Sequence, residues 1–237
     1  QLVEGQLDRT GGLAPKTVID LLAIVKSTIG YAQYKGFPVI CNLSRLSVKR
    51  KDKEMRVLTP SERESLIGIL MEDMDSFKFG VFLALYTGIR IGELCALQWK
   101  DIDFARATLK VRKTIQRIQN IDRQAVSKTK IVISVPKSKC SIREIPLSVS
   151  VMDIAQNFIS YPESYVLTGT SRYIEPRTMQ NHFKLYVKQS GISDANFHAL
   201  RHTFATRCVE VGFEIKSLSE ILGHASVNIT LNRYVHS

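Results

Sequence analysis

The C-terminal region places histidine, arginine and tyrosine side chains at spacings that strongly restrict how this part of the chain can fold. His198 and Arg201 stand three positions apart, so a helix would present both on one face, with Cβ atoms about 5–6 Å apart. Gly223 is typical of the residue that follows a helix C-terminus, so His224 is expected in a tight turn. Tyr234 follows ten positions later (234 − 224). The region therefore predicts a helix, a turn and a C-terminal tyrosine whose polar side chains act at one site.

The residue types in this region predict a binding site for a phosphate group. A guanidinium can hold two phosphate oxygens, and an imidazole can donate one further hydrogen bond. A second arginine, Arg90, is predicted at a helix start, after an apolar helix over residues 77–86 and a turn at Gly88. Helix N-termini favour anions because their first N–H groups have no partner within the helix. Tyr234 is then the expected nucleophile on the bound phosphate.

Two phrases, Thr-Gly-Ile-Arg-Ile-Gly-Glu-Leu and Leu-Arg-His-Thr-Phe-Ala, together with Asn-Arg-Tyr-Val-His, resemble the tyrosine recombinases, also called the phage integrase family. They are most similar to integrases of conjugative transposons from Gram-positive bacteria, and the resemblance runs from about residue 57 onward. It implies that Arg90 is the first catalytic arginine and that His198 and Arg201 form the His-x-x-Arg box. It also implies that His224 is the second histidine and Tyr234 the nucleophile.

The resemblance implies an enzyme that exchanges DNA strands without a metal or nucleotide cofactor. Tyr234 would attack a scissile phosphate, form a 3′-phosphotyrosyl bond and release a 5′ hydroxyl, and a 5′ hydroxyl from a partner duplex would then reseal the strand. Two alternatives stay open. A type IB topoisomerase runs the same chemistry on one duplex, and a non-catalytic relative would only bind DNA.

The leaving 5′ oxygen needs a proton, which the family usually takes from a lysine at a β-turn. The segment Val135-Pro-Lys137-Ser-Lys139 has this form, and both lysines qualify. Lys137 is preferred because the family's catalytic lysine tends to stand at the end of the incoming strand. Lys139 is then expected to contact backbone phosphates.

Two further residues are expected to support the catalytic ones. Glu93 lies one helical turn after Arg90 and either orients Arg90 or is a surface carboxylate. His198 and His202 have the i, i+4 spacing of a zinc pair, but the glutamate of His-Glu-x-x-His is absent and no third ligand is evident. No metal site is therefore expected, and His202 is predicted to be buried and hydrogen-bonded.

The charge of the chain indicates a nucleic-acid partner. Its 237 residues carry a net charge of +11, with a pI near 9.6. Residues 1–56 hold 10 Lys and Arg against 5 Asp and Glu, which supplies +5 of the total (10 − 5). A merely solvated basic surface is the alternative. The expected DNA-binding residues are Lys49, Arg50, Lys51, Arg117, Arg123, Lys128, Lys130 and Lys139.

The sequence predicts a mainly α fold with a small antiparallel β-sheet, in two domains. Residues 1–47, with an amphipathic helix over 15–33, resemble a truncated helical core-type DNA-binding domain, and 48–56 form a basic linker. Residues 57–237 form an α+β catalytic domain, which opens with a capping box and carries a β insertion near 113–135. Strands are expected near 107–112, 131–135 and 143–147, with the polar stretch 116–130 as either a β-ribbon or a loop.

Cysteine usage and hydropathy fit a reducing compartment, and the resemblance implies a bacterial cytoplasmic protein. The four cysteines show no Cys-x-x-Cys pairing, no apolar run approaches about 18 residues, and no signal peptide is visible. The chain begins at Gln1, which suggests a fragment that lacks an N-terminal arm-binding domain. The expected partners are double-stranded DNA of transposon ends and target, further copies of the chain as a dimer to tetramer, and an accessory excision protein.

Overall fold

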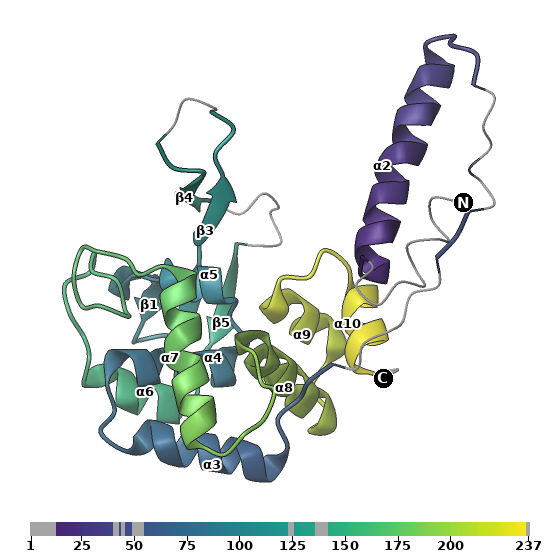
Figure 1. Ribbon diagram of the computed structural model, residues 1–237. Helices are drawn as coiled ribbons and strands as arrows, with labels where there is room; N and C mark the ends of the chain where they lie inside the picture. Colours follow the sequence, from purple (N-terminus) through teal and green to yellow (C-terminus); the bar gives the residue numbers. More distant parts are fainter. Residues whose placement is uncertain are drawn as a thin grey trace. The chain divides into compact units, whose positions relative to one another are not determined.

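The computed structural model describes residues 13–39, 43, 46–48, 55–122, 126–135 and 142–235 (Figure 1). The chain divides into two compact units, Gln1–Glu54 and Met55–Ser237. The first unit contains helix α2, Pro15–Tyr34, which begins with proline in its first turn. No residue of α2 is buried. The Nζ of Lys26 donates to the carbonyl of Leu46 at 2.9 Å and ties the helix to the segment that follows it.

The second unit is built around helix α4, Ser76–Thr87, which is buried on almost every side. Phe79 and Leu83 of this helix are fully buried, and burial of such a side chain contributes about 1.5–3 kcal/mol. The helices that pack around α4 include α3 (Pro60–Met71), α6 (Val149–Gln156), α7 (Pro176–Gln189) and α8 (Phe197–Glu210).

The predicted capping box opens the second unit at α3. The backbone N–H of Glu62 donates to the hydroxyl of Thr59, and the carboxylate of Glu62 accepts from the backbone N–H of Thr59. These two bonds satisfy donors that a helix start otherwise leaves without partners. Local sequence chemistry thus fixes where this helix begins.

A small antiparallel sheet lies beside the helices, in the order β1–β2–β5. Its strands are β1 (Ile102–Asp103), β2 (Thr108–Val111) and β5 (Arg143–Pro146). Leu109 pairs with Ile145, and Val111 pairs with Arg143. All four of these side chains are buried, so an arginine occupies a position in the inward row. The prediction of a mainly helical chain with a small antiparallel sheet is confirmed.

The polar stretch after the first sheet strands forms a β-ribbon rather than a loop. Strand β3, Thr114–Gln119, pairs in antiparallel register with β4, Thr129–Ser134, and the ribbon projects from the unit (Figure 1). The sequence could not decide between a ribbon and a loop here, because only Ile115 of the six residues of β3 is buried and no alternation of polar and apolar residues marks the strand. Gly92 lets the ribbon approach closely, since a Cβ there would lie 2.6 Å from the carbonyl oxygen of Ile115.

Three short helices border the candidate site together with α8: α5 (Ile91–Cys95), α9 (Ile215–Leu222) and α10 (Val227–Tyr234). Helices α4 and α9 end at Gly88 and Gly223, both in the left-handed conformation with φ of 63° and 64°. Glycine adopts this conformation without the steric cost that a Cβ brings, as the sequence predicted for both turns. These two turns bring Arg90 and His224 to the same part of the molecule.

Candidate active site

Three arginines converge on the C-terminal turn of α9. Arg143, Arg201 and Arg90 donate to the consecutive backbone carbonyls of residues 221–223, with N···O distances of 2.5, 2.6 and 3.2 Å. The last carbonyls of a helix have no partner within it and carry partial negative charge, so three guanidinium groups stabilise this end strongly. The turn that follows holds His224, and the arginines therefore fix the position of that histidine.

Glu93 joins two of these arginines. Its carboxylate accepts from the Nη1 of Arg90 at 2.9 Å and from the backbone N–H of Arg90 at 3.0 Å. The same carboxylate accepts two bonds from Arg143, at 3.0 and 2.8 Å. Burial raises the pKa of Glu93, but the hydrogen bonds and charge of Arg143 and the charge of Arg90 outweigh it, so this pKa lies below its ordinary value. Glu93 is a buried carboxylate that holds Arg90 in place.

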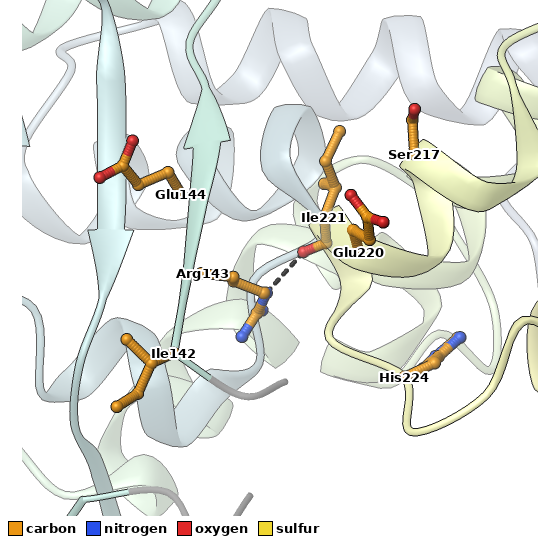
Figure 2. A pocket seen from close by; sticks show the side chains of 7 residues that line it. All are labelled: Ile142, Arg143, Glu144, Ser217, Glu220, Ile221 and His224. Atoms are coloured by element: carbon orange, nitrogen blue, oxygen red, sulfur yellow. Dashed lines mark hydrogen bonds between the residues drawn. The ribbon is translucent and has the colours of Figure 1, made fainter. Parts of the chain in front are cut away.

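Arg143 also belongs to the site, although the sequence identified it only as part of a predicted strand. Figure 2 shows it between β5 and α9, donating to the carbonyl of Ile221. It borders a cavity of about 430 Å³ whose lining also includes His224. One signal could have found it, because Arg143 alternates with Ile145 and Leu147 and so falls on the inward face of a predicted strand. A buried arginine needs a buried partner, and Glu93 supplies it.

We expect the Arg143→Met variant to lose about 3–5 kcal/mol of unfolding free energy at neutral pH, because it leaves Glu93 buried without its main partner. In the unaltered protein the pKa of Glu93 is lowered, so its contribution is present above about pH 4.3 and is lost as the pH falls through the folded-state pKa. Without Arg143, burial would raise this pKa above its ordinary value. The penalty of the substitution should then shrink as the pH is lowered toward about 5.

Urea unfolding at about pH 8 and about pH 5 measures this penalty. The matched control is the double variant Glu93→Gln with Arg143→Met, which removes both charges. It should be more stable at pH 8 than Arg143→Met alone. A loss that is the same at both pH values, with no relief in the double variant, would show that the Glu93–Arg143 pair does not govern the effect.

The two predicted catalytic arginines have different exposure. The side chain of Arg90 is 37% exposed, whereas Arg201 is only 2% exposed and donates through Nη1 to the carbonyl of Gly88 at 2.8 Å. Burial and the charges of Arg90 and Arg143 lower the pKa of Arg201 to about 9, so it remains a cation at neutral pH. The backbone carbonyls use two of the five N–H groups of Arg201, which leaves three donors on this guanidinium.

Tyr234 lies within the same cluster and is 6% exposed. Its hydroxyl is 3.0 Å from the Nδ1 of His202, and its ring is parallel to that of His224, with centroids 6.4 Å apart. The Nδ1 of His224 is in turn 2.8 Å from the hydroxyl of Thr230, a contact that the sequence did not indicate. His198 as a whole residue is exposed, but its ring packs edge to face on the ring of His202 at a centroid distance of 4.5 Å, which partly removes the ring from water.

Burial and the arginine charges set the protonation of these side chains. Burial first and neighbouring positive charges second lower the pKa of His198, and they lower those of His202 and His224 to about 4. Burial raises the pKa of Tyr234, while the charges of Arg201 and Arg233 act in the opposite direction. At neutral pH the histidines are therefore neutral and the phenol keeps its proton.

The structure brings five of the predicted catalytic residues into one cluster: Arg90, His198, Arg201, His224 and Tyr234. His202 is buried and hydrogen-bonded to Tyr234, and Glu93 is buried against two arginines. Six other predicted residues lie outside the described residues: Lys49, Arg50, Lys51, Arg123, Lys137 and Lys139.

Three predicted DNA-binding residues lie on the β-ribbon. The side chains of Lys128 and Lys130 are exposed. Arg117 makes two hydrogen bonds to the carboxylate of Glu175, at 3.1 and 2.6 Å, and one to the hydroxyl of Thr129 at 2.7 Å. Arg117 is therefore held in an ion pair, although its side chain remains 45% exposed.

Two further properties concern the part of the chain that the structure describes. Within it, histidine, cysteine and acidic side chains do not gather in any group of three or more that could hold a metal ion. Over the same residues, no helix combines the length and apolar character needed to cross a membrane.

Several known proteins are similar to this chain in sequence. A model of the phage integrase family matches residues 56–237. The tyrosine recombinase XerC-like protein of Caldanaerobacter subterraneus is 28% identical over 95% of this chain and 63% of its own length. The ICEBs1 integrase of Bacillus subtilis is 26% identical over 82% of this chain and 54% of its own. The chain thus spans less than two thirds of the length of either relative.

A solved structure agrees with the fold. The Tn1549 transposon integrase, in complex with circular intermediate DNA, is 26% identical and matches with a TM-score of 0.75. The match covers 95% of this chain and 77% of that one.

Proposed function

The chain belongs to the phage integrase family, and we propose that it is a tyrosine recombinase that cuts and rejoins DNA strands at specific sites to integrate or excise a mobile element. One observation carries the proposal. Arg90 and Arg201, 111 positions apart in sequence (201 − 90), meet at the turn before His224, and the phenol of Tyr234 packs against this same histidine. A phosphate and its attacking nucleophile need such an arrangement.

The chemistry follows from the charge of the substrate. A phosphodiester is anionic, so a nucleophile approaches it readily only when its nonbridging oxygens are neutralised. Arg90 and Arg201 would supply this neutralisation, and neutral His198 and His224 would donate hydrogen bonds to the same oxygens. Attack by the Tyr234 oxygen forms the bond to phosphorus and breaks the bond to the 5′ oxygen. The 3′-phosphotyrosyl product keeps the energy of a phosphodiester, so a 5′ hydroxyl can reseal the strand without a nucleotide.

The leaving 5′ oxygen takes a proton, for which we propose Lys137, with Lys139 as the alternative. The Lys137→Ala variant should cleave ordinary DNA slowly and should be rescued by a substrate that carries sulfur at the 5′ bridging position, because a thiolate leaves without protonation. Single-turnover cleavage of both substrates measures the rescue. Lys139→Ala is the matched control, and rescue of this variant in place of Lys137→Ala would reassign the acid.

The proposed partners follow from the reaction. Exchange between two duplexes breaks four strands, and each copy of the chain supplies one Tyr234, so we propose assembly from dimer to tetramer on DNA. The substrates would be transposon ends and target in a bacterial cytoplasm, with an accessory excision protein directing the reaction. The proposed phosphate contacts come from Lys49, Arg50, Lys51, Arg117, Arg123, Lys128, Lys130 and Lys139.

The decisive experiment is incubation with nicked duplexes that carry candidate element ends, followed by denaturing electrophoresis. A nick a few nucleotides beyond the scissile phosphate leaves only a short fragment with the released 5′ hydroxyl. This fragment diffuses away, so the covalent complex accumulates. The proposal expects an adduct that maps to the peptide containing Tyr234, and recombinant products from two intact duplexes. Supercoil relaxation without recombinant products would indicate a topoisomerase, and binding without any adduct would indicate a non-catalytic DNA-binding protein.

A further inference from the structure

We propose that His202, rather than His198 of the His-x-x-Arg box, accepts the proton of the Tyr234 hydroxyl when this residue attacks DNA. The assignment rests on the proposed function. It starts from the contact between the Nδ1 of His202 and the Tyr234 hydroxyl, which are 3.0 Å apart, within the reach that proton transfer requires. Tyr234 Oη is the reacting atom, so the group that touches it is the first candidate for its base.

The position of His202 suits a base because its ring is held on two sides. His202 is 8% exposed on α8, with the ring of His198 against it at 4.5 Å and the ring of Tyr234 at 5.8 Å. These two ring contacts restrict rotation of the imidazole and keep its Nδ1 directed toward the hydroxyl. Burial, followed by electrostatic repulsion from His198, Arg233 and Arg201 when they are protonated, lowers the pKa of His202. The imidazole is therefore neutral at pH 7 and has a lone pair to accept the bond from the phenol O–H.

The other polar groups near the Tyr234 hydroxyl are poorly suited to take its proton. The Nδ1 of His224 bonds to the Thr230 hydroxyl, and its ring is stacked within 6° of parallel to that of Tyr234, which directs its nitrogens away from the line to the phenol oxygen. Arg201 and Arg233 are cations without a free lone pair, and they stabilise the phenolate instead. His202 combines contact, neutrality and a lone pair.

The proposed step balances in both directions. In cleavage, the bond from Tyr234 Oη to phosphorus forms, the bond from phosphorus to the 5′ oxygen breaks, the phenol proton moves to Nδ1 of His202, and the proposed lysine protonates the 5′ oxygen. In rejoining, the attacking 5′ hydroxyl returns a proton to the lysine, and the departing phenolate recovers its proton from His202. The bound phosphate also offsets the positive charges around His202 and makes it a stronger base when it is needed.

The test compares three variants in single-turnover formation of the covalent complex between about pH 6 and pH 9. The His202→Asn variant places an amide oxygen near the position of Nδ1 and can keep the hydrogen bond, but it cannot take a proton. The His202→Ala variant loses both functions. The matched control is His182→Asn, since His182 stacks on Phe77 at 4.0 Å and has no part in the proposed site. Circular dichroism and DNA affinity verify that each variant is folded.

We expect both His202 variants to be slowed by about a hundredfold or more at pH 7, the lower end of what general base catalysis contributes. Their rates should rise about tenfold per pH unit, because hydroxide or preformed phenolate replaces the missing base, while the unaltered protein stays nearly flat. Added imidazole should accelerate His202→Ala and leave His182→Asn unchanged.

Two results would overturn the assignment. If His202→Asn retains the normal rate, the hydrogen bond alone matters. If both variants are slowed by one factor at every pH and imidazole has no effect, His202 is structural. Failure of the proposed function looks different, because the unaltered protein would then form no covalent complex with any tested DNA end.

Discussion

The Tyr234→Phe variant is expected to form no covalent complex with DNA and to bind DNA as tightly as the unaltered protein. The substitution removes only the nucleophilic oxygen and keeps the ring that packs on His224 and on the small core of Ala205, Leu218 and Leu222. The lost hydrogen bond leaves the Nδ1 of His202 buried without a partner, which should cost about 1–3 kcal/mol of stability. The rate effect is therefore total, whereas the effect on folding is modest.

Denaturing electrophoresis on nicked DNA measures the adduct, and a titration at fixed salt measures affinity. Tyr186→Phe is the matched control, because Tyr186 is another buried tyrosine at 4% exposure and lies on α7 outside the site. The control should form the adduct at the normal rate. An adduct that persists in Tyr234→Phe would mean that another residue attacks the phosphate.

Local signals in the sequence were sufficient for the helix ends that build the site. The capping box at Thr59 and the glycines at Gly88 and Gly223 act through backbone bonds to near neighbours, so short segments contain all the information that is needed. The same holds for Arg90 at the start of α5, whose carboxylate partner Glu93 lies one turn away. These helix ends depend only on neighbouring residues, and the structure has them at the predicted positions.

Contacts between distant segments could not be derived in this way. Arg143 bonds to Glu93, 50 positions away, and to a carbonyl of α9, 78 positions away. The strand pattern shows only that Arg143 faces inward, and it does not show what lies opposite. The contact of His202 with Tyr234 likewise depends on how α10 packs on α8, and no local pattern favours His202 over His198 as the partner of the phenol.

The sequence left residues 116–130 open between a β-ribbon and a loop, for a different reason. Hydrophobic alternation marks a strand only where one face is buried, and β3 buries Ile115 alone. The ribbon is instead held by its antiparallel pairing and by the close approach to α5 that Gly92 permits. Backbone pairing of this kind leaves little trace in the side-chain pattern.

The Arg201→Lys variant is expected to lose cleavage by on the order of 10²–10³-fold, equivalent to about 3–4 kcal/mol in the barrier, as for removal of one transition-state donor. The guanidinium spans two carbonyls that belong to different segments, at Gly88 and Leu222, and still has three N–H groups to offer. A lysine ammonium is a point donor on a flexible stem, and it cannot span both carbonyls and a phosphate at once. The change also releases the turn that holds His224.

Single-turnover cleavage, DNA affinity and thermal unfolding separate the consequences of this variant. Arg207→Lys is the matched control, since Arg207 lies on the same helix, is 45% exposed, and forms only an ion pair with Glu210 at 2.5 Å. Such an exposed pair contributes about 0–1 kcal/mol, so the control should cleave normally. If Arg201→Lys cleaves at the rate of Arg207→Lys while both remain folded, the charge of Arg201 is sufficient and its fork geometry is not needed. A loss of cleavage with nearly unchanged affinity would instead place the effect in the transition state, where one additional negative charge develops on the phosphate oxygens.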